Sequence, residues 1–201
     1  MKLITLFTAL IVSTMIFSQE TTDYKKPAID ILTQTYKVLD DKVSNLTEAE
    51  LRYVPQDDGW SILNNLEHLA FVEKVLNKGL SDMIEAGDIQ TDKDLSMNDW
   101  LVISQVTDRT NKAKTPPKFE PQPELKDKGR DYFMAEIKKY RDHTLWLIKD
   151  SKLNLRKIFG PYLYGEADGL QQALIIGAHC YRHTVQIDEV LKEMYSEKEK
   201  E

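Results

Sequence analysis

The chain has 201 residues, of which 41% are hydrophobic and 30% are charged. This balance is typical of a globular protein with a sizeable core and excludes a disordered chain. The formal net charge is −6, and the sequence contains no basic stripe interleaved with aromatic residues, so nucleic acid is excluded as an expected partner. With only 8 Gly and 7 Pro, the composition favours long helices over short strands.

The first residues have the pattern of an export signal. Lys2 supplies a positive start, and residues 3–17 form an apolar run that is diluted only by Thr and Ser. We predict a signal peptide over residues 1–19, cleaved after Ser18 or Gln19. The mature protein is then exported, periplasmic or secreted, and free of the membrane. An uncleaved anchor is the alternative, which the shortness of the run disfavours because a spanning helix needs about 20 apolar residues.

The next segments predict two amphipathic helices. From Ile29 to Leu46 the apolar residues are spaced alternately by three and four, with Pro27 in the first turn, as in a helix with one buried face. Residues 47–59 break this period and predict turns. Ser61 is a good N-cap for a second helix, over residues 62–86.

The second half of the chain predicts a long connection and two more helices. Residues 87–124 are polar and rich in proline, with a short helix over 97–108, and a connection of this length is typical of a crossover along a bundle or of a functional loop. A third helix is expected over 128–149. After a link containing Gly160, Pro161, Gly165 and Gly169, a fourth helix over 170–195 is apolar on almost all sides and should be the most buried. The sequence therefore predicts one all-α domain, a four-helix bundle over residues 27–195.

Three of the four histidines are placed so that they can converge. His179 and His183 are four residues apart on the fourth helix, and their face also carries Ile176 and Ile187, so both point toward the core. His68 on the second helix can supply a third imidazole from across the bundle. Three neutral imidazoles suit Zn, Ni or Fe and leave positions open for water or substrate. The alternative is a group of core-edge histidines that are hydrogen-bonded to carbonyl groups or water.

The single cysteine limits the chemistry of such a site. Cys180 cannot form an internal disulfide, and one cysteine excludes a thiolate cluster, so any metal must be held by His, Asp or Glu. Gln172 and Gln186 fall on the face of the histidine pair, and Asn65 lies beside His68. These three amides either line a pocket at the site or pack at the core edge.

The other residues that could carry chemistry are expected to have structural roles. Glu67 points about 100° away from His68 and is expected to be solvated, or to lie behind the ligands. We interpret the remaining four as follows: Arg182 as an ion-pairing residue, Trp60 as a plug under the start of the second helix, Cys180 as a small buried hydrophobe, and His143 as a solvated histidine on a polar stretch with Arg141.

The chain resembles the DinB-like superfamily. Residues 59–62 (GWSI) and 65–70 (NLEHLA) are similar to the start of its second helix, and residues 178–183 (AHCYRH) with 186–187 (QI) are similar to its fourth helix. Residues 108–109 (DR), with the proline-rich stretch, resemble the linker of one branch. The likeness runs over nearly the whole mature chain, and the motifs are specific as a set rather than singly.

The resemblance implies a four-helix bundle in which three histidines hold a divalent metal ion. Those positions match His68, His179 and His183. Branches of the family resemble metal-dependent transferases that use small thiols, and related isomerases and hydrolases. We therefore expect a metal-dependent hydrolase or group transferase acting on a small molecule. A non-catalytic module that binds a metal or small ligand, and a bundle that acts by forming a homodimer, are the alternatives.

Overall fold

Four long helices form a closed bundle in the computed structural model, which describes residues 23–110 and 115–198. The helices are α1 (Lys26–Val43), α3 (Ile62–Ala86), α5 (Arg130–Asp150) and α6 (Gly169–Lys198). Around the bundle α1 packs on α6, α6 on α3, α3 on α5, and α5 on α1. The expected signal peptide, residues 1–19, lies outside the described residues. Within them, no helix is long and apolar enough to cross a membrane.

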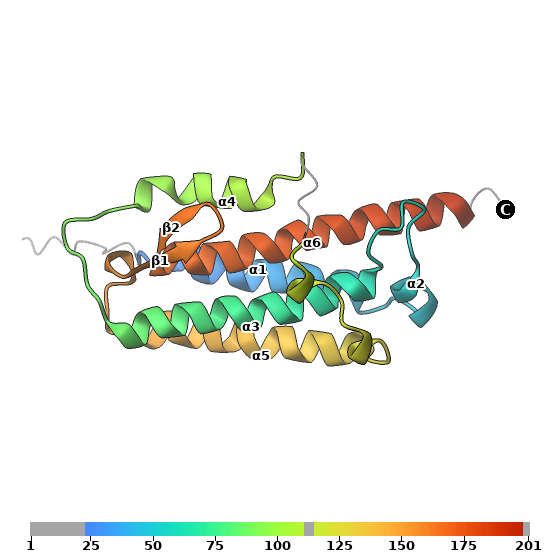
Figure 1. Cartoon of the computed structure of the whole chain (residues 1–201), viewed down its shortest axis with the longest axis horizontal. Coiled ribbons are helices and arrows are strands. Elements are labelled where there is room, and N and C mark those ends of the chain that lie inside the picture. Colours follow the sequence, from blue (N-terminus) through green and yellow to red (C-terminus); the bar gives the residue numbers. More distant parts are fainter. Residues whose placement is uncertain (1–22, 111–114, 199–201) are drawn as a thin grey trace, which may run out of the picture.

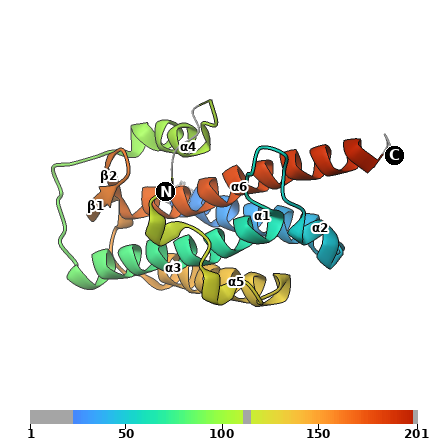
Figure 2. The ribbon, with the colours of Figure 1, turned by 45° about the vertical axis from the view of Figure 1, so that its right-hand side comes forward.

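The connection from α3 to α5 is a crossover. In Figure 1, α1 and α6 run in one direction and α3 and α5 in the other. Because α3 and α5 are parallel, the chain between them must return along the bundle, as the sequence predicted. This crossover contains the short helix α4 (Asp99–Thr107), which lies on α6 outside the bundle (Figures 1 and 2). It also contains three 3-10 turns, η1 (Ser96–Asn98), η2 (Pro117–Phe119) and η3 (Pro123–Leu125).

The helix boundaries follow their local signals. Ser61 caps α3: its hydroxyl accepts the N–H of Asn64 at 3.1 Å, while Oδ1 of Asn64 accepts the N–H of Ser61 at 3.2 Å. The same helix ends at Gly87, whose φ of 61° suits glycine. The third and fourth helices start and end within three residues of their predicted limits.

One short helix and one β-hairpin were not predicted. Residues 47–59 contain a short helix, α2 (Glu48–Arg52), which Thr47 caps together with Glu50. The link before α6 contains a hairpin of β1 (Phe159–Tyr162) and β2 (Gly165–Asp168), which pair antiparallel with Phe159 opposite Asp168. The bundle is therefore helical apart from one small sheet, which lies next to the start of α6 (Figure 1).

A buried ion pair lies inside the bundle. Arg141 and Glu73 are each 2% exposed or less, and both guanidinium Nε and Nη2 donate to the Glu73 carboxylate. Arg141 also donates to the carbonyl oxygen of Leu32 at 2.6 Å and to Oγ1 of Thr35 at 3.0 Å. The expected polar stretch around His143 is thus wrong for Arg141, because this residue faces the core and finds its partner on another helix.

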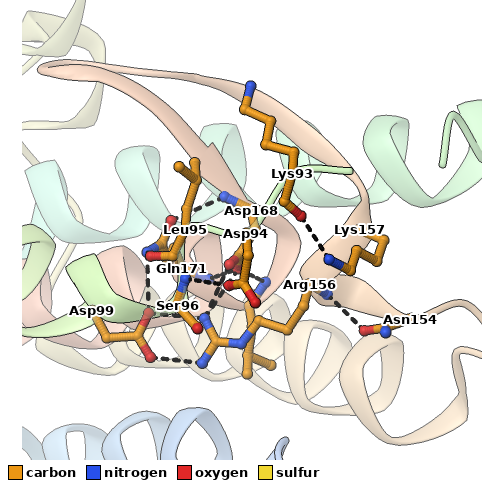
Figure 3. A network of polar contacts seen from close by, with 11 residues as sticks. Lys93, Asp94, Leu95, Ser96, Asp99, Asn154, Arg156, Lys157, Asp168 and Gln171 are labelled. Carbon is orange, nitrogen blue, oxygen red and sulfur yellow. Dashed lines mark hydrogen bonds and ion pairs between the residues drawn. The ribbon is translucent and has the colours of Figure 1, made fainter. Parts of the chain in front are cut away.

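A polar network fixes the start of α6 (Figure 3). Asp168 is fully buried and accepts the N–H groups of Leu170 and Gln171 at 2.9 and 2.8 Å, so it caps the helix. Arg156, from the turn η4 (Leu155–Lys157), donates to Asp168 at 3.0 Å and to both carboxylate oxygens of Asp99 at 2.8 and 2.6 Å. Because Asp99 begins α4, the network fixes the start of α4 relative to the start of α6.

Candidate metal centre

The structure brings the three predicted histidines together. One ring nitrogen from each of His68, His179 and His183 lies within 4.8 Å of the others, and the Nε2 atoms of His68 and His179 are 3.4 Å apart. The ring centroids are separated by 4.6 to 5.2 Å. His179 and His183 come from successive turns of α6, and His68 faces them from α3. The convergence on one point, which the spacing predicted, is therefore present.

The ring of His183 is oriented by an amide. Its Nδ1 lies 2.9 Å from Oδ1 of Asn65, and Nδ2 of Asn65 donates to the carbonyl oxygen of Ser61 at 2.9 Å. Because the amide nitrogen is used by that carbonyl, Oδ1 is the acceptor and Nδ1 of His183 carries the proton. Nε2 of His183 then has a free lone pair. Asn65, one of the predicted pocket residues, thus lies directly behind the histidine cluster.

The ring of His68 is oriented by the main chain of the crossover. Its Nδ1 lies 2.8 Å from the carbonyl oxygen of Phe119. A carbonyl oxygen can only accept, so Nδ1 carries the proton and Nε2 presents its lone pair toward His179. Metal-binding histidines are commonly fixed in this way by a partner on the second ring nitrogen. No sequence signal marks this contact, because any residue provides a main-chain oxygen.

The donor set fits a transition metal ion. Two nitrogen ligands about 2.05 Å from a tetrahedral ion lie about 3.3 Å apart, close to the 3.4 Å between Nε2 of His68 and Nε2 of His179. Imidazole suits Zn, Ni, Cu and Fe, and three ligands leave one position of a tetrahedron for another group. Among the described residues, no carboxylate joins the cluster.

The three imidazoles are held neutral. Burial lowers the pKa of His179 to about 3, with further lowering by His68 and by the guanidinium groups of Arg182 and Arg141. Burial also lowers the pKa of His183 well below its usual range, and that of His68 against the opposing effect of the Phe119 carbonyl. A neutral imidazole is the form that binds metal, so these ligands lose no affinity to protons at neutral pH.

An indole ring covers part of the cluster. The ring of Trp60 lies 4.9 Å from that of His68 and is stacked 6.3 Å from that of His183, measured between centroids. Trp60 precedes the N-cap of α3, as expected for a plug at the start of this helix. It also packs against two of the candidate ligands and limits how far their rings can rotate.

The two glutamines of the predicted pocket have other hydrogen-bond partners. Nε2 of Gln172 donates to the carbonyl oxygen of Pro161 at 3.2 Å, so this amide holds the hairpin. Oε1 of Gln186 accepts from Nη1 of Arg109 at 3.3 Å. Gln172 shares a helical face with His179 but is two turns away, about 10 Å along the axis. The structure therefore brings Asn65, but not Gln172, to the histidines.

Glu67 is buried rather than solvated. Its carboxylate does not belong to the cluster, but the side chain is only 7% exposed, and Oε1 accepts the N–H of Gln122 at 2.5 Å. Burial raises the pKa of Glu67. His68 and Glu67 therefore attach α3 to two positions of the crossover, Phe119 and Gln122, through successive residues.

The remaining candidates lie outside the cluster. His143 is exposed, bonded to Oδ1 of Asn77 and stacked on Trp146. Cys180 is fully buried, which raises the pKa of its thiol, and it behaves as the predicted small hydrophobe. Arg182 donates to the main-chain oxygens of Val106 and Asp108 and so holds the end of α4, a role that the sequence did not predict.

The fold and the site define a helical-bundle protein with a buried three-histidine cluster that could bind a metal ion. The DinB superfamily model matches residues 31–187, which include all three histidines and all four bundle helices in large part. The chain belongs to the DinB superfamily. No curated protein and no solved structure with which the chain was compared matches it.

Proposed function

We propose that His68, His179 and His183 hold one divalent transition metal ion, Zn, Ni or Fe, and that the protein is a metal-dependent hydrolase or group transferase. The observation that carries this proposal is the convergence of three neutral imidazoles, two of which have Nδ1 engaged by Phe119 and Asn65. When bound, such an ion supplies Lewis-acid chemistry, which activates water or a carbonyl group.

The protein's own residues prepare the site for this role. Asn65 and the Phe119 carbonyl fix two tautomers, and Trp60 restricts the rings. Burial keeps the imidazoles unprotonated. His179 keeps some exposure to solvent, whereas His68 and His183 are buried. This arrangement supports one ion with at least one position left for a small-molecule substrate.

The second candidate function is ligand binding without catalysis. It is favoured by one observation: no Asp or Glu among the described residues belongs to the cluster, and the nearby Glu67 accepts the N–H of Gln122. A hydrolytic metal site commonly includes a carboxylate or histidine that moves protons. In this alternative the ion, or the space beside it, captures a small ligand.

Elemental analysis of protein purified from its own host tests the metal. Wild type should contain about one transition-metal equivalent per chain, and His179→Ala should lose at least 10–100-fold in affinity. His143→Ala is the matched control, because it removes the one histidine outside the cluster. Equal metal content in all three proteins, or none in wild type, contradicts the proposal.

Turnover separates the two functions. A panel of ester, amide and thiol substrates is assayed with native, chelated and reloaded protein. Activity that chelation removes and metal restores supports the enzyme. Ligand-dependent stabilisation without turnover supports the binding module.

We also propose that the protein is exported after cleavage behind Ser18 or Gln19, on the basis of the apolar run in residues 3–17. The mass of the mature chain, recovered from the periplasm or medium, tests this, and an intact N-terminus contradicts it.

A homodimer is a further proposal. The mass in solution tests it, with the triple histidine variant showing whether association depends on the cluster.

A further inference from the structure

An open cavity lies beside His68 of the histidine cluster. It has a volume of about 160 Å³ and is bordered by α3, α5 and the crossover around η2 and η3, with Phe71 and Tyr132 partly exposed at its mouth. Of the three clustered histidines only His68 lines it, and it does so together with Phe119, whose carbonyl oxygen is bonded to Nδ1 of His68. The Nε2 atom that belongs to the cluster points toward His179 instead. The cavity therefore shares His68 with the cluster and is lined by neither His179 nor His183.

Two pairs of aromatic side chains line part of this cavity. Phe71 of α3 and Phe119 of the crossover meet edge to face with centroids 5.5 Å apart, and Tyr132 and Phe133 of α5 do so at 5.3 Å. One pair comes from α3 and the crossover and the other from α5, and both pairs border the same space. A cavity of about 150 Å³ lined by apolar side chains accommodates a benzene ring. The size and the lining together fit one six-membered aromatic ring.

A buried carboxylate also faces this space. Glu67 lines the cavity while being 93% buried, since only 7% of its surface is exposed. One oxygen accepts the N–H of Gln122, and among the described residues no cation forms an ion pair with Glu67. Glu136 of α5 is a second, half-buried carboxylate in the lining, whereas the lysine there, Lys74, is exposed at the mouth. A buried carboxylate is costly unless a cation or hydrogen-bond donors satisfy it.

We propose that this cavity binds a small aromatic ammonium compound. The ring lies among Phe71, Phe119, Tyr132 and Phe133, and the ammonium group pairs with the carboxylate of Glu67. The faces of aromatic rings attract cations as well, so the lining and the carboxylate favour the same ligand charge. This site goes beyond the proposed metal function, because neither the ring nor the ammonium group needs a metal ion for binding.

Calorimetric titration of metal-stripped protein tests the site, since an amine cannot then bind through a metal ion. The probes are benzylamine, neutral benzyl alcohol of nearly the same shape, and anionic benzoate. Benzylamine should bind at least tenfold more tightly than benzyl alcohol, and benzoate should bind most weakly. No binding of benzylamine at millimolar concentration, or equal affinities for the amine and the alcohol, overturns the proposal.

Two variants assign the contacts. Glu67→Gln retains an oxygen for the N–H of Gln122 but removes the charge, so it should weaken benzylamine at least tenfold and leave benzyl alcohol unchanged. Ala70→Leu places a larger side chain in the lining and should weaken both probes. Glu124→Gln is the matched control, because it removes a carboxylate of η3 that does not line the cavity. If Glu67→Gln and Glu124→Gln weaken benzylamine equally, Glu67 is not the partner and the proposal fails.

The result is independent of the proposed metal function. Elemental analysis decides whether the histidines hold an ion, and titration of the metal-stripped protein decides whether the cavity holds an amine. A protein that binds metal but not benzylamine overturns only the amine site. A protein that binds benzylamine but no metal overturns only the metal centre.

Discussion

The Nδ1 atom of His183 on α6 lies 2.9 Å from Oδ1 of Asn65 on α3. The same amide donates to the carbonyl oxygen of Ser61, the N-cap of α3. The helix start is thereby connected through one side chain to a candidate metal ligand on another helix. This connection makes the orientation of His183 depend on residues that do not themselves belong to the cluster.

Asn65→Ala is therefore expected to weaken metal binding by about 10–100-fold, as loss of a ligand's hydrogen-bond partner commonly does. The affinity is measured by competition with a chromogenic chelator. Asn65→Asp retains an acceptor for Nδ1–H and should recover much of the loss. Asn77→Ala is the control, because Asn77 is another buried amide of α3 and its histidine partner is His143. An equal loss in both alanine variants would show that the effect comes from general destabilisation.

Metal binding should stabilise the folded chain. A ligand that binds only the folded state adds about 2.7 kcal/mol when its concentration is one hundred times the Kd. For a domain of this size, that corresponds to a rise in Tm of roughly 5–11 °C. The measurement is thermal unfolding with and without Zn²⁺. The variant with alanine at all three cluster histidines should show no rise, and a similar rise in that variant would place the ion elsewhere.

The metal-free protein should lose stability as the pH falls below about 6.5. The pKa values of His68, His179 and His183 are lowered in the folded state, to about 3 for His179, whereas unfolding restores ordinary values near 6.5. Below pH 6.5 the unfolded state then binds more protons, so the free energy of unfolding decreases. Each histidine contributes a slope of up to about 1.36 kcal/mol per pH unit.

Urea unfolding between pH 7 and pH 5 measures this slope. The variant with glutamine at the three histidines should have a shallower dependence over the same range, and the difference between the two proteins isolates the imidazoles from the carboxylates. Equal slopes would mean that the rings are protonated or solvated in the folded protein.

The parts of the fold that the sequence predicted depend on local signals. The period of apolar residues and the capping side chain of Ser61 determine the helices within a few residues of where they lie. The spacing of His179 and His183 places them on one face. The hairpin was missed because strands of four residues are too short to show alternation. The signal for α2, Thr47 followed by Glu50, was present in the sequence but was interpreted as turns.

The parts of the site that could not be predicted depend on contacts distant in the chain. Phe119 reaches His68 through a main-chain oxygen, which any residue could provide. Gln172 was placed near the cluster because residues seven apart share a helical face, although they also lie two turns apart along the axis. Arg141 was considered polar surface because its buried partner, Glu73, is on another helix. The partner that a group finds on another helix or on the crossover is a tertiary property, which a single sequence leaves undetermined, whereas the separation of Gln172 from His179 follows from helix geometry alone.

We expect the fold to tolerate the loss of both buried charges, Arg141 and Glu73, better than the loss of one. Glu73→Gln leaves a guanidinium charge in the core, with the Leu32 carbonyl and Thr35 hydroxyl as its remaining partners, and should destabilise the fold by about 3–5 kcal/mol. The double variant Glu73→Leu with Arg141→Met removes both charges at similar volume and should be more stable than Glu73→Gln. Urea unfolding at pH 7 measures both. If the double variant were the less stable protein, the buried charges would themselves stabilise the bundle, and this prediction would be wrong.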